Sequence, residues 1–160
     1  MSAQITPVEL AAYATMKRAI VSIRLSLGKQ AQELGGISLV QFEILLMLEQ
    51  SERGLRMHEL ADAVGISRSG LTYQVGQLEK AGWVQREGGT GGAAGSRAVI
   101  AVLTDAGRAH ILGLQERHFE FVRERVFGRL AQDEIEQLSA MFQRIADGSG
   151  EQPERSPEPA

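Results

Sequence analysis

Apolar residues recur at three- and four-residue spacings along most of the chain, which is the pattern of amphipathic helices. The first such stretch opens with Thr6-Pro7-Val8-Glu9, which supplies a capping hydroxyl, a proline in the first turn and a glutamate that can cap back. The pair Gly35-Gly36 is expected to end this helix. A second capping box, Ser38-Leu39-Val40-Gln41, opens the next helix. The side chains that this second helix is expected to bury are Phe42, Leu45, Leu46 and Leu48.

Two shorter helices follow, joined by a tight turn. The apolar positions of the first fall at i, i+3, i+4 and i+7, and Gly65 follows them as a left-handed residue that ends the helix. Ser67 is placed to cap the second helix, and Gly82 closes it. The pattern therefore predicts a helical pair whose apolar faces are buried. Those faces carry Met57, Leu60, Ala61 and Val64 on the first helix, and Leu71, Val75, Leu78 and Ala81 on the second.

The remainder of the chain predicts a β-hairpin and then two more helices. Residues 83–86 and 97–103 have the composition of strands, and the glycine-rich segment between them is expected to be an exposed hairpin tip. Thr104-Asp105 is expected to cap a long helix that runs to about Phe127. A last helix is expected over about 133–146.

These elements predict a mainly α fold with a small β-hairpin wing (α+β), in the order of a winged helix-turn-helix with flanking helices. The winged helix-turn-helix is assigned to residues 36–103, and the flanking helical region to residues 5–34 and 104–147. Residues 148–160, in a tail from Asp147 rich in Gly, Pro, Ser and Glu, are predicted to be disordered. The flanking helices carry more apolar positions than a small winged domain needs, so we expect them to form a homodimer.

Composition narrows the class of protein further. A chain of 160 residues with 43% hydrophobic and 23% charged residues is typical of one soluble globular domain. It has no cysteine, which excludes disulfides and thiolate zinc sites, and no apolar run approaches the ~20 residues of a membrane span. No secretion signal is visible, so we expect a cytoplasmic protein without a membrane partner. No nucleophile–base arrangement is visible either, so neither an enzyme nor a cofactor is expected.

Three histidines and one apolar stripe admit more than one interpretation. His58, His110 and His118 lack the spacing that would face one metal ion from adjacent helical turns, so solvated or hydrogen-bonded histidines are the preferred interpretation. The stripe on the long helix is expected to belong to the core or the dimer interface, and a contribution to a ligand pocket is the alternative. Its residues are Phe119, Phe121, Val122, Val126 and Phe127.

The second helix of the pair has the residue types of a DNA-recognition helix. Ala61 lets two helices approach closely, and Gly65 makes the turn between them. Arginine can pair with guanine, glutamine with adenine, and serine or threonine with phosphate. Arg86 and Arg97 on the hairpin add cations that can reach the minor groove or the backbone. The residues expected on the exposed face of the helix are Ser67, Arg68, Ser69, Thr72, Tyr73, Gln74 and Gln77.

Charge alone does not predict DNA binding. The net charge is −3, and residues 53–97 hold six basic side chains against four acidic ones. Because affinity for DNA depends largely on cationic contacts with phosphate, such a weak excess of positive charge is unusual for a DNA-binding protein. A winged helix that binds a protein or a ligand and has lost specific DNA binding is therefore the alternative function.

Three linked segments resemble the MarR (multiple antibiotic resistance regulator) family. Residues 60–72 and 78–86 are similar to its helix-turn-helix and first wing strand, and residues 97–107 to its second wing strand and long helix. The resemblance covers about residues 7–147. It implies a two-fold dimer whose outer helices intertwine while two winged domains reach successive major grooves of double-stranded DNA. It also implies a repressor that a small aromatic effector releases from DNA.

The sequence departs from the family pattern at two places. The family commonly has an aspartate two positions before the wing arginine, and this chain has Gly95 there, so Arg97 lacks an orienting partner. Many relatives carry an arginine near the middle of the recognition helix, where this chain has Tyr73 and Gln74. Fewer fixed charges predict a contact with DNA that is weaker or depends more on the bases, and a low salt dependence would support this prediction.

Overall fold

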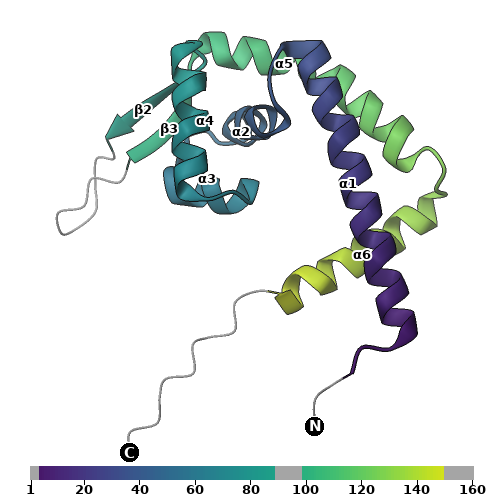
Figure 1. Ribbon diagram of the computed structural model, residues 1–160. Helices are drawn as coiled ribbons and strands as arrows, with labels where there is room; N and C mark the ends of the chain where they lie inside the picture. The colour runs from purple at the N-terminus through teal and green to yellow at the C-terminus, as the bar shows by residue number, and fades with distance from the viewer. Residues whose placement is uncertain (1–3, 89–98, 150–160) are drawn as a thin grey trace, which may run out of the picture. The chain divides into compact units, whose positions relative to one another are not determined.

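The computed structural model describes residues 4–88 and 99–149 and divides the chain into two compact units at Val122 (Figure 1). Within the described residues, the first unit contains all of the strands, and the second contains a π-helical turn and the last helix. The mainly α fold with a small antiparallel sheet is confirmed. The elements are α1 (Pro7–Gly35), α2 (Leu39–Glu49), β1 (Leu55–Arg56), α3 (Met57–Val64), α4 (Arg68–Lys80), β2 (Val84–Gly88), β3 (Val99–Leu103), α5 (Asp105–Val122), the π-helical turn Arg123–Phe127, and α6 (Gln132–Ser149).

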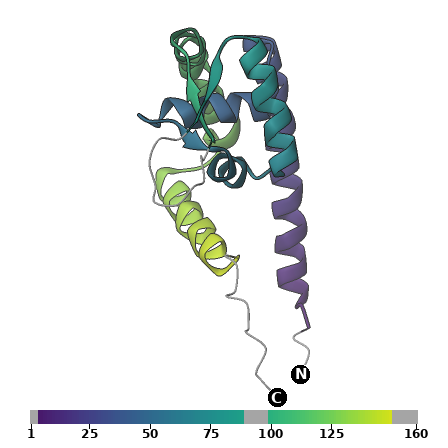
Figure 2. The ribbon, with the colours of Figure 1, turned by 90° about the vertical axis from the view of Figure 1, so that its left-hand side faces the viewer.

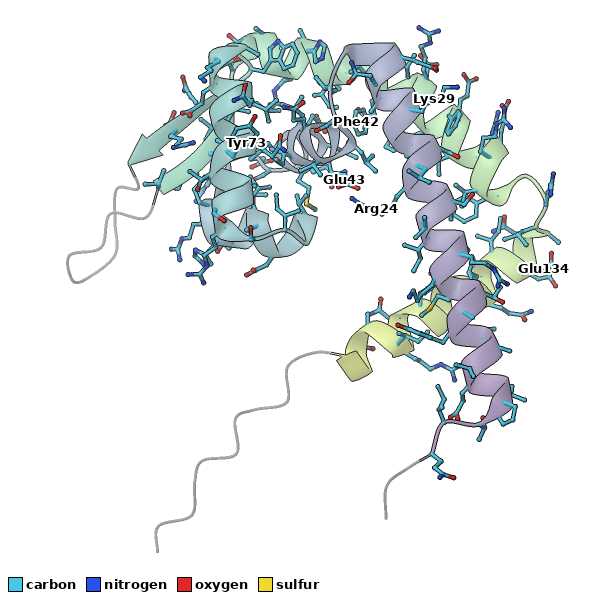
Figure 3. The ribbon with its side chains drawn as sticks, viewed as in Figure 1. Arg24, Lys29, Phe42, Glu43, Tyr73 and Glu134 are labelled. Atoms are coloured by element: carbon cyan, nitrogen blue, oxygen red, sulfur yellow. The ribbon has the colours of Figure 1, made fainter. Side chains whose placement is uncertain are left out.

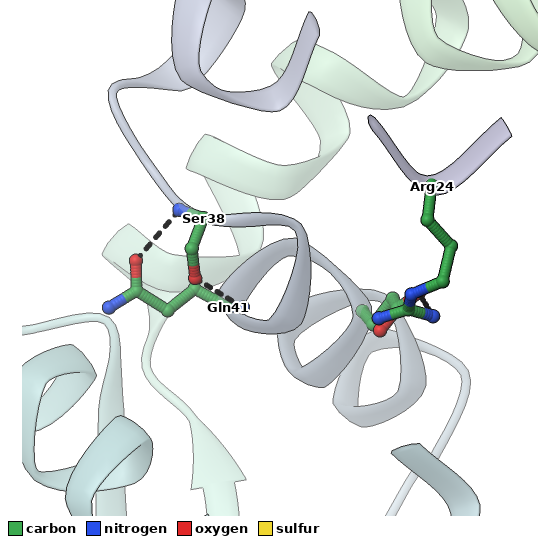
Figure 4. Close-up of polar contacts among 4 residues, drawn as sticks. Arg24, Ser38 and Gln41 are labelled. Carbon is green, nitrogen blue, oxygen red and sulfur yellow. Dashed lines mark hydrogen bonds and ion pairs between the residues drawn. The ribbon is translucent and has the colours of Figure 1, made fainter. Parts of the chain in front are cut away.

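Both predicted capping boxes are confirmed. The Thr6 hydroxyl accepts a hydrogen bond from the Glu9 amide at 3.2 Å, and the Glu9 carboxylate accepts one from the Thr6 amide at 2.7 Å. Ser38 and Gln41 form the same reciprocal pair at 3.2 and 3.0 Å at the start of α2 (Figure 4). Each box satisfies backbone donors that a helix N-terminus would otherwise leave unpaired, which is why these short motifs locate the helix starts.

Helix α2 forms the centre of the core of the first unit. Phe42, Leu45 and Leu48 are buried as predicted, whereas Leu46 is half-buried and Ile44 is fully buried. The helix contacts α1, α3, α4, α5 and β3, so apolar residues are buried on more than one of its sides. That arrangement explains why a single apolar face, read from spacing, missed Ile44.

The sheet has three strands in the order β1-β3-β2, all antiparallel. Strand β1 was not predicted, because two residues are too few to show an alternating pattern; Leu55 pairs with Ala101. Strand β2 begins one residue later than expected, at Val84. Ala81, predicted to be buried on α4, is exposed because it lies in the turn at the C-terminal end of that helix.

Helix α1 is long and mostly exposed. Its buried residues are Gln30 and Ala31, both near its C-terminal end, where it packs on α2 and α5. The N-terminal half extends beyond the winged helix in both views (Figures 1 and 2). Within residues 4–88 and 99–149, no single helix is long and apolar enough to cross a membrane. Helices α1 and α2 meet that criterion only as a pair, across a bend of 76°.

The start of α5 is bound tightly to the base of the wing. The Thr104 hydroxyl donates to the Gly82 carbonyl at 2.7 Å and accepts from the Gly107 amide at 3.0 Å. A Cβ atom at Gly107 would overlap the backbone of Trp83, so only glycine fits there. The Trp83 ring is also stacked on His110, with 4.0 Å between ring centroids.

The second unit differs from the predicted helices at their ends. The predicted long helix is α-helical to Val122 and continues as the π-helical turn to Phe127. A π-helical turn is wider and changes the hydrogen-bond pattern without interrupting the helix. Helix α6 continues to Ser149, so residues 148 and 149, predicted to belong to a disordered tail, are helical. The rest of that tail, residues 150–160, lies outside the described residues.

Candidate nucleic-acid interface

Helices α3 and α4 form the predicted helix-turn-helix. Ala61 is fully buried where the helices meet. Gly65 has a φ of 72°, and its amide donates to the Ala61 carbonyl at 2.9 Å. The Ile66 amide donates to the same carbonyl at 3.1 Å. A residue with a side chain is strained in this left-handed conformation, which is the physical reason for glycine at the turn.

The N-terminal half of α4 presents small polar groups to solvent. Ser67 caps the helix by accepting from the Gly70 amide at 3.1 Å, and its hydroxyl lies 3.2 Å from that of Ser69. The Thr72 hydroxyl donates to the Arg68 carbonyl at 2.9 Å. Leu71, Val75 and Leu78 are buried on the opposite face, as predicted, and fix the helix to the core.

The structure brings five of the predicted site residues together on this half of α4. Tyr73, labelled on α4 in Figure 3, has 65% of its surface exposed. Gln74 and Gln77, which were expected on the exposed face, are half-buried on the flanks of the helix. The exposed residues of the cluster are Ser67, Arg68, Ser69, Thr72 and Tyr73, which we call the α4 surface.

Arg68 is the cation of the α4 surface. It forms no ion pair with any residue of 4–88 or 99–149. Beside it lies a hollow of about 210 Å³ between the start of α3, α4 and the outer end of β3. An unpaired guanidinium at the start of a helix, beside amides that the helix leaves unbonded, is suited to bind an anion. The hollow is lined by Met57, His58, Arg68, Thr72 and Val99.

Arg86 is placed differently from the other predicted site residues. Its Nη2 donates to the Thr72 carbonyl at 3.1 Å and lies 3.2 Å from a carboxylate oxygen of Glu79. The guanidinium therefore holds β2 against α4. It lies over Gly76, where an added Cβ atom would be 3.7 Å from Nη2. Sequence reasoning missed Glu79 as its partner, since the contact joins two elements that spacing alone does not bring together. Arg97, with Gly95, lies outside the described residues.

A second group of polar side chains lies where α1 meets α2 and α5. His118 is buried, its Nδ1 lies 2.8 Å from the Gln30 amide oxygen, and the Gln30 amide nitrogen donates to the Arg117 carbonyl at 3.1 Å. Since that amide oxygen must accept, Nδ1 carries the proton. Burial lowers the pKa of His118, and it also lowers the pKa of His110. The expectation of a hydrogen-bonded histidine is confirmed for His118.

Glu43 belongs to the same junction. It pairs with Arg24 of α1 at 3.4 Å (Figures 3 and 4), and its other carboxylate oxygen is buried without a hydrogen-bond partner among the described residues. Burial raises the pKa of Glu43, and the neighbouring Arg24 opposes that rise. The described residues contain no group of three side chains able to hold a metal ion.

Comparison with known proteins agrees with this geometry. Residues 35–93 match the model of the MarR family. Sco3205 of Streptomyces coelicolor, a MarR family transcriptional regulator solved in complex with DNA, is 31% identical with a TM-score of 0.83, over 98% of this chain and 96% of that one. AbsC of the same organism is 28% identical with a TM-score of 0.78, over 92% and 97%. BldR of Sulfolobus solfataricus, 22% identical with a TM-score of 0.76 over 90% and 99%, shares the fold. No curated protein matches the sequence.

The fold and the α4 surface thus define a winged helix-turn-helix protein. The similarity to Sco3205 over nearly the whole of both chains then identifies the family: the chain belongs to the MarR family of transcriptional regulators.

Proposed function

We propose that this protein is a transcriptional regulator, a repressor, that binds a pseudo-palindromic operator in double-stranded DNA as a homodimer. The observation that carries the proposal is the α4 surface, in which Arg68 is exposed and forms no ion pair with the described residues. It lies beside the capped start of a helix whose other face is fixed in the core. The DNA complex of Sco3205, a relative with the same fold, supports the same function here. The proposal implies a cytoplasmic location and no enzymatic activity.

The proposed contacts differ in kind along α4. Arg68 is suited to a guanine edge or a phosphate, and Ser67 and Ser69 to the phosphate backbone. Tyr73 offers an aromatic ring to the floor of the major groove, and Gln77 lies one turn farther along. Arg86 supports this surface from behind by holding the wing strand on α4, and Arg97 is proposed to reach DNA from the wing.

The proposed dimer uses the helical regions outside the winged helix. Val8, Val21 and Leu25 of α1 have 79%, 56% and 71% of their surface exposed. Met141 and Phe142 of α6 are 47% and 44% exposed. So many large apolar side chains on two helices of one chain favour a partner that covers them. Two-fold symmetry would then space the two α4 helices for half-sites about one turn of DNA apart, ~34–36 Å.

An effector site is proposed at the junction of α1, α2 and α5. The half-buried Glu43 has a carboxylate oxygen without a hydrogen-bond partner among the described residues, and this oxygen is the polar group proposed to bind a small aromatic molecule there. Binding there would change how α1 and α5 meet the winged helix. In this proposal, the change at the junction releases the protein from DNA.

The alternative is a winged helix that binds a protein or a ligand and no longer reads DNA. The α4 surface holds one cation, and the Nη2 of Arg86 is already committed to Thr72 and Glu79. This arrangement offers fewer contacts with phosphate than affinity for DNA usually requires.

Fluorescence anisotropy with the DNA upstream of the gene and with a scrambled duplex, at two salt concentrations, separates the two functions. A working regulator should bind the upstream duplex with a dissociation constant within ~10⁻⁸–10⁻¹¹ M. Arg68→Ala should weaken specific binding by a factor of roughly 5–150, the loss of one good base contact. Lys29→Ala is the matched control, since it removes one exposed cation from α1, where the lysine pairs with Glu33. Equal weak binding to both duplexes, unchanged by Arg68→Ala, would favour the alternative.

A further inference from the structure

The hydroxyl of Thr72 is turned towards the helix backbone. It donates to the Arg68 carbonyl at 2.9 Å, one turn earlier in α4, so its single hydrogen is used within the helix. Since the methyl and hydroxyl groups are on different sides of Cβ, the methyl group points away from that carbonyl. Because the hydroxyl is bonded within the helix, the methyl group is the part of this exposed residue that is left for an apolar contact.

The hollow beside Thr72 holds two apolar side chains, one from α3 and one from β3. Met57 and Val99 line the same hollow, and Val99 has 43% of its surface exposed. Arg68 and His58 complete the hollow. A neutral methyl group beside other apolar side chains is a poor partner for a phosphate oxygen, and it is a good partner for another methyl group.

One base presents a methyl group in the major groove. The C5 methyl of thymine distinguishes it there from the other three bases, and threonine methyl groups make apolar contacts with it. The neighbouring serines are engaged with each other, because the hydroxyls of Ser67 and Ser69 lie 3.2 Å apart and Ser67 also caps the helix. Arg68, Thr72 and Tyr73 are thus the exposed residues of the first turns of α4 that remain for base contacts, beside the half-buried Gln74.

We propose that Thr72 is a specificity-determining residue that reads a thymine in each half-site through its methyl group. The inference rests on the proposed function, DNA binding through α4, and deepens it by assigning the base and the chemical group that recognises it. It replaces the role in phosphate binding that the residue type alone predicts for a threonine hydroxyl.

The test removes one methyl group at a time from either side of the contact. Duplexes that the full-length wild-type protein retains are selected from a random library, and each thymine of the selected site is then replaced singly by deoxyuridine, which lacks only the C5 methyl. At one position per half-site, uracil should weaken binding by a factor of about three to ten, the effect of one buried methyl group. Thr72→Ser, which keeps the hydroxyl and removes the methyl, should bind the thymine and uracil duplexes equally.

Thr72→Val is the matched variant, because it keeps methyl groups and removes the hydroxyl. It should retain the preference for thymine. Both substitutions are at an exposed position, and equal melting temperatures of the three proteins would show that folding is unaffected.

Three outcomes would overturn the inference. Equal binding of every uracil duplex by the wild type excludes a methyl contact. A thymine preference that survives in both Thr72→Ser and Thr72→Val assigns the contact to another residue, and one that is kept in Thr72→Ser but lost in Thr72→Val assigns it to the hydroxyl. A failure to select any duplex contradicts the proposed function itself, and is thereby distinct from failure of the Thr72 contact alone.

Discussion

Buried titratable side chains at the junction of α1, α2 and α5 make the stability of this protein depend on pH. His118 contacts Gln30 and Phe42, with 4.2 Å between its ring centroid and that of Phe42. Because burial lowers its pKa in the folded state, the unfolded chain binds a proton at a higher pH than the folded chain does.

Stability should therefore fall as the pH falls through about 6.5, the ordinary pKa of histidine in an unfolded chain, and the loss should stop below the lowered pKa of the folded state. His118→Asn keeps an amide donor near the position of Nδ1 and removes the titration. We expect its free energy of unfolding, measured with urea at one protein concentration, to fall less between pH 8 and pH 5 than that of the wild type.

Above pH 8 the two proteins should differ by a constant amount, because the imidazole is neutral in both states. A wild-type curve parallel to that of His118→Asn across the whole range would contradict the assignment of the pH dependence to this side chain.

The sequence was enough to predict which side chains of α4 are exposed. It was not enough to predict which hydrogen bonds they form. Spacing placed Arg68, Thr72 and Tyr73 on the outer face, and all three are exposed. Spacing does not show that Arg86 reaches the carbonyl of Thr72, since the strand must first fold back over 14 residues. Nor does it show which way a threonine hydroxyl turns, because the choice depends on the local backbone acceptor.

At the scale of elements, the recognition helix and the wing depend on one another through Arg86. The guanidinium connects β2 with both Glu79 and the backbone of α4, and all of these groups are partly exposed. Such a pair adds only about 0.2–1 kcal/mol to stability, so its main effect is on the angle at which the wing leaves the helix.

A double-mutant cycle on DNA affinity distinguishes a positioning role from a direct contact. If Arg86 positions the wing, Arg86→Ala and Glu79→Ala should weaken specific binding by similar factors, and the double variant should be no weaker than either. Arg108→Ala is the control, since it breaks a comparable exposed pair, with Glu49 at 3.3 Å, that does not involve α4. A much larger loss for Arg86→Ala than for Glu79→Ala would assign Arg86 to the DNA.

Two glycines of α5 should respond in opposite ways to alanine. At Gly107 a Cβ atom would overlap the Trp83 carbonyl, so Gly107→Ala should destabilise the protein by about 1–3 kcal/mol or more. At Gly113 no atom lies within 4 Å of the added Cβ, so Gly113→Ala should stabilise it by roughly 0.5–1 kcal/mol through the better helix propensity of alanine. Thermal melts followed by circular dichroism test both. A Gly107→Ala protein as stable as the wild type would show that the base of the wing can shift.

The elements that begin with a capping motif could be predicted within a residue or two, because the cap is a local interaction encoded in four consecutive residues. The starts of α1, α2 and α4 follow from Thr6, Ser38 and Ser67. Strand β1 and the π-helical turn could not be predicted in this way. The first exists only through its pairing with β3, and the second through a change in helical hydrogen bonding that no residue pattern announces.

For the whole molecule, the exposed apolar side chains of α1 set the expected state in solution. We expect light scattering after gel filtration to give twice the 17.4 kDa mass of one chain. Leu25→Asp, which places a charge on a residue with 71% of its surface exposed, should shift the mass towards that of one chain and weaken binding to a two-half-site duplex. Val99→Asp places a charge on an exposed residue of the wing and should leave the mass unchanged. A wild-type protein that remains monomeric at micromolar concentration would contradict the dimer.

Helix α5 is fixed at its first turn to the base of the wing, so a small tilt of the helix displaces its far end the most. Thr104 and Gly107 fix its first turn to Gly82 and Trp83, and its 18 residues extend for about 27 Å. At that length a tilt of about 5° at the far end displaces it by roughly 2 Å, while the pivot lies directly beside the end of α4. We therefore expect a small rotation of α5 to displace Gly82 and Trp83, which directly follow the end of α4. A displacement at the far end of α5 could thus change the position of the α4 surface without repacking the core of the winged helix.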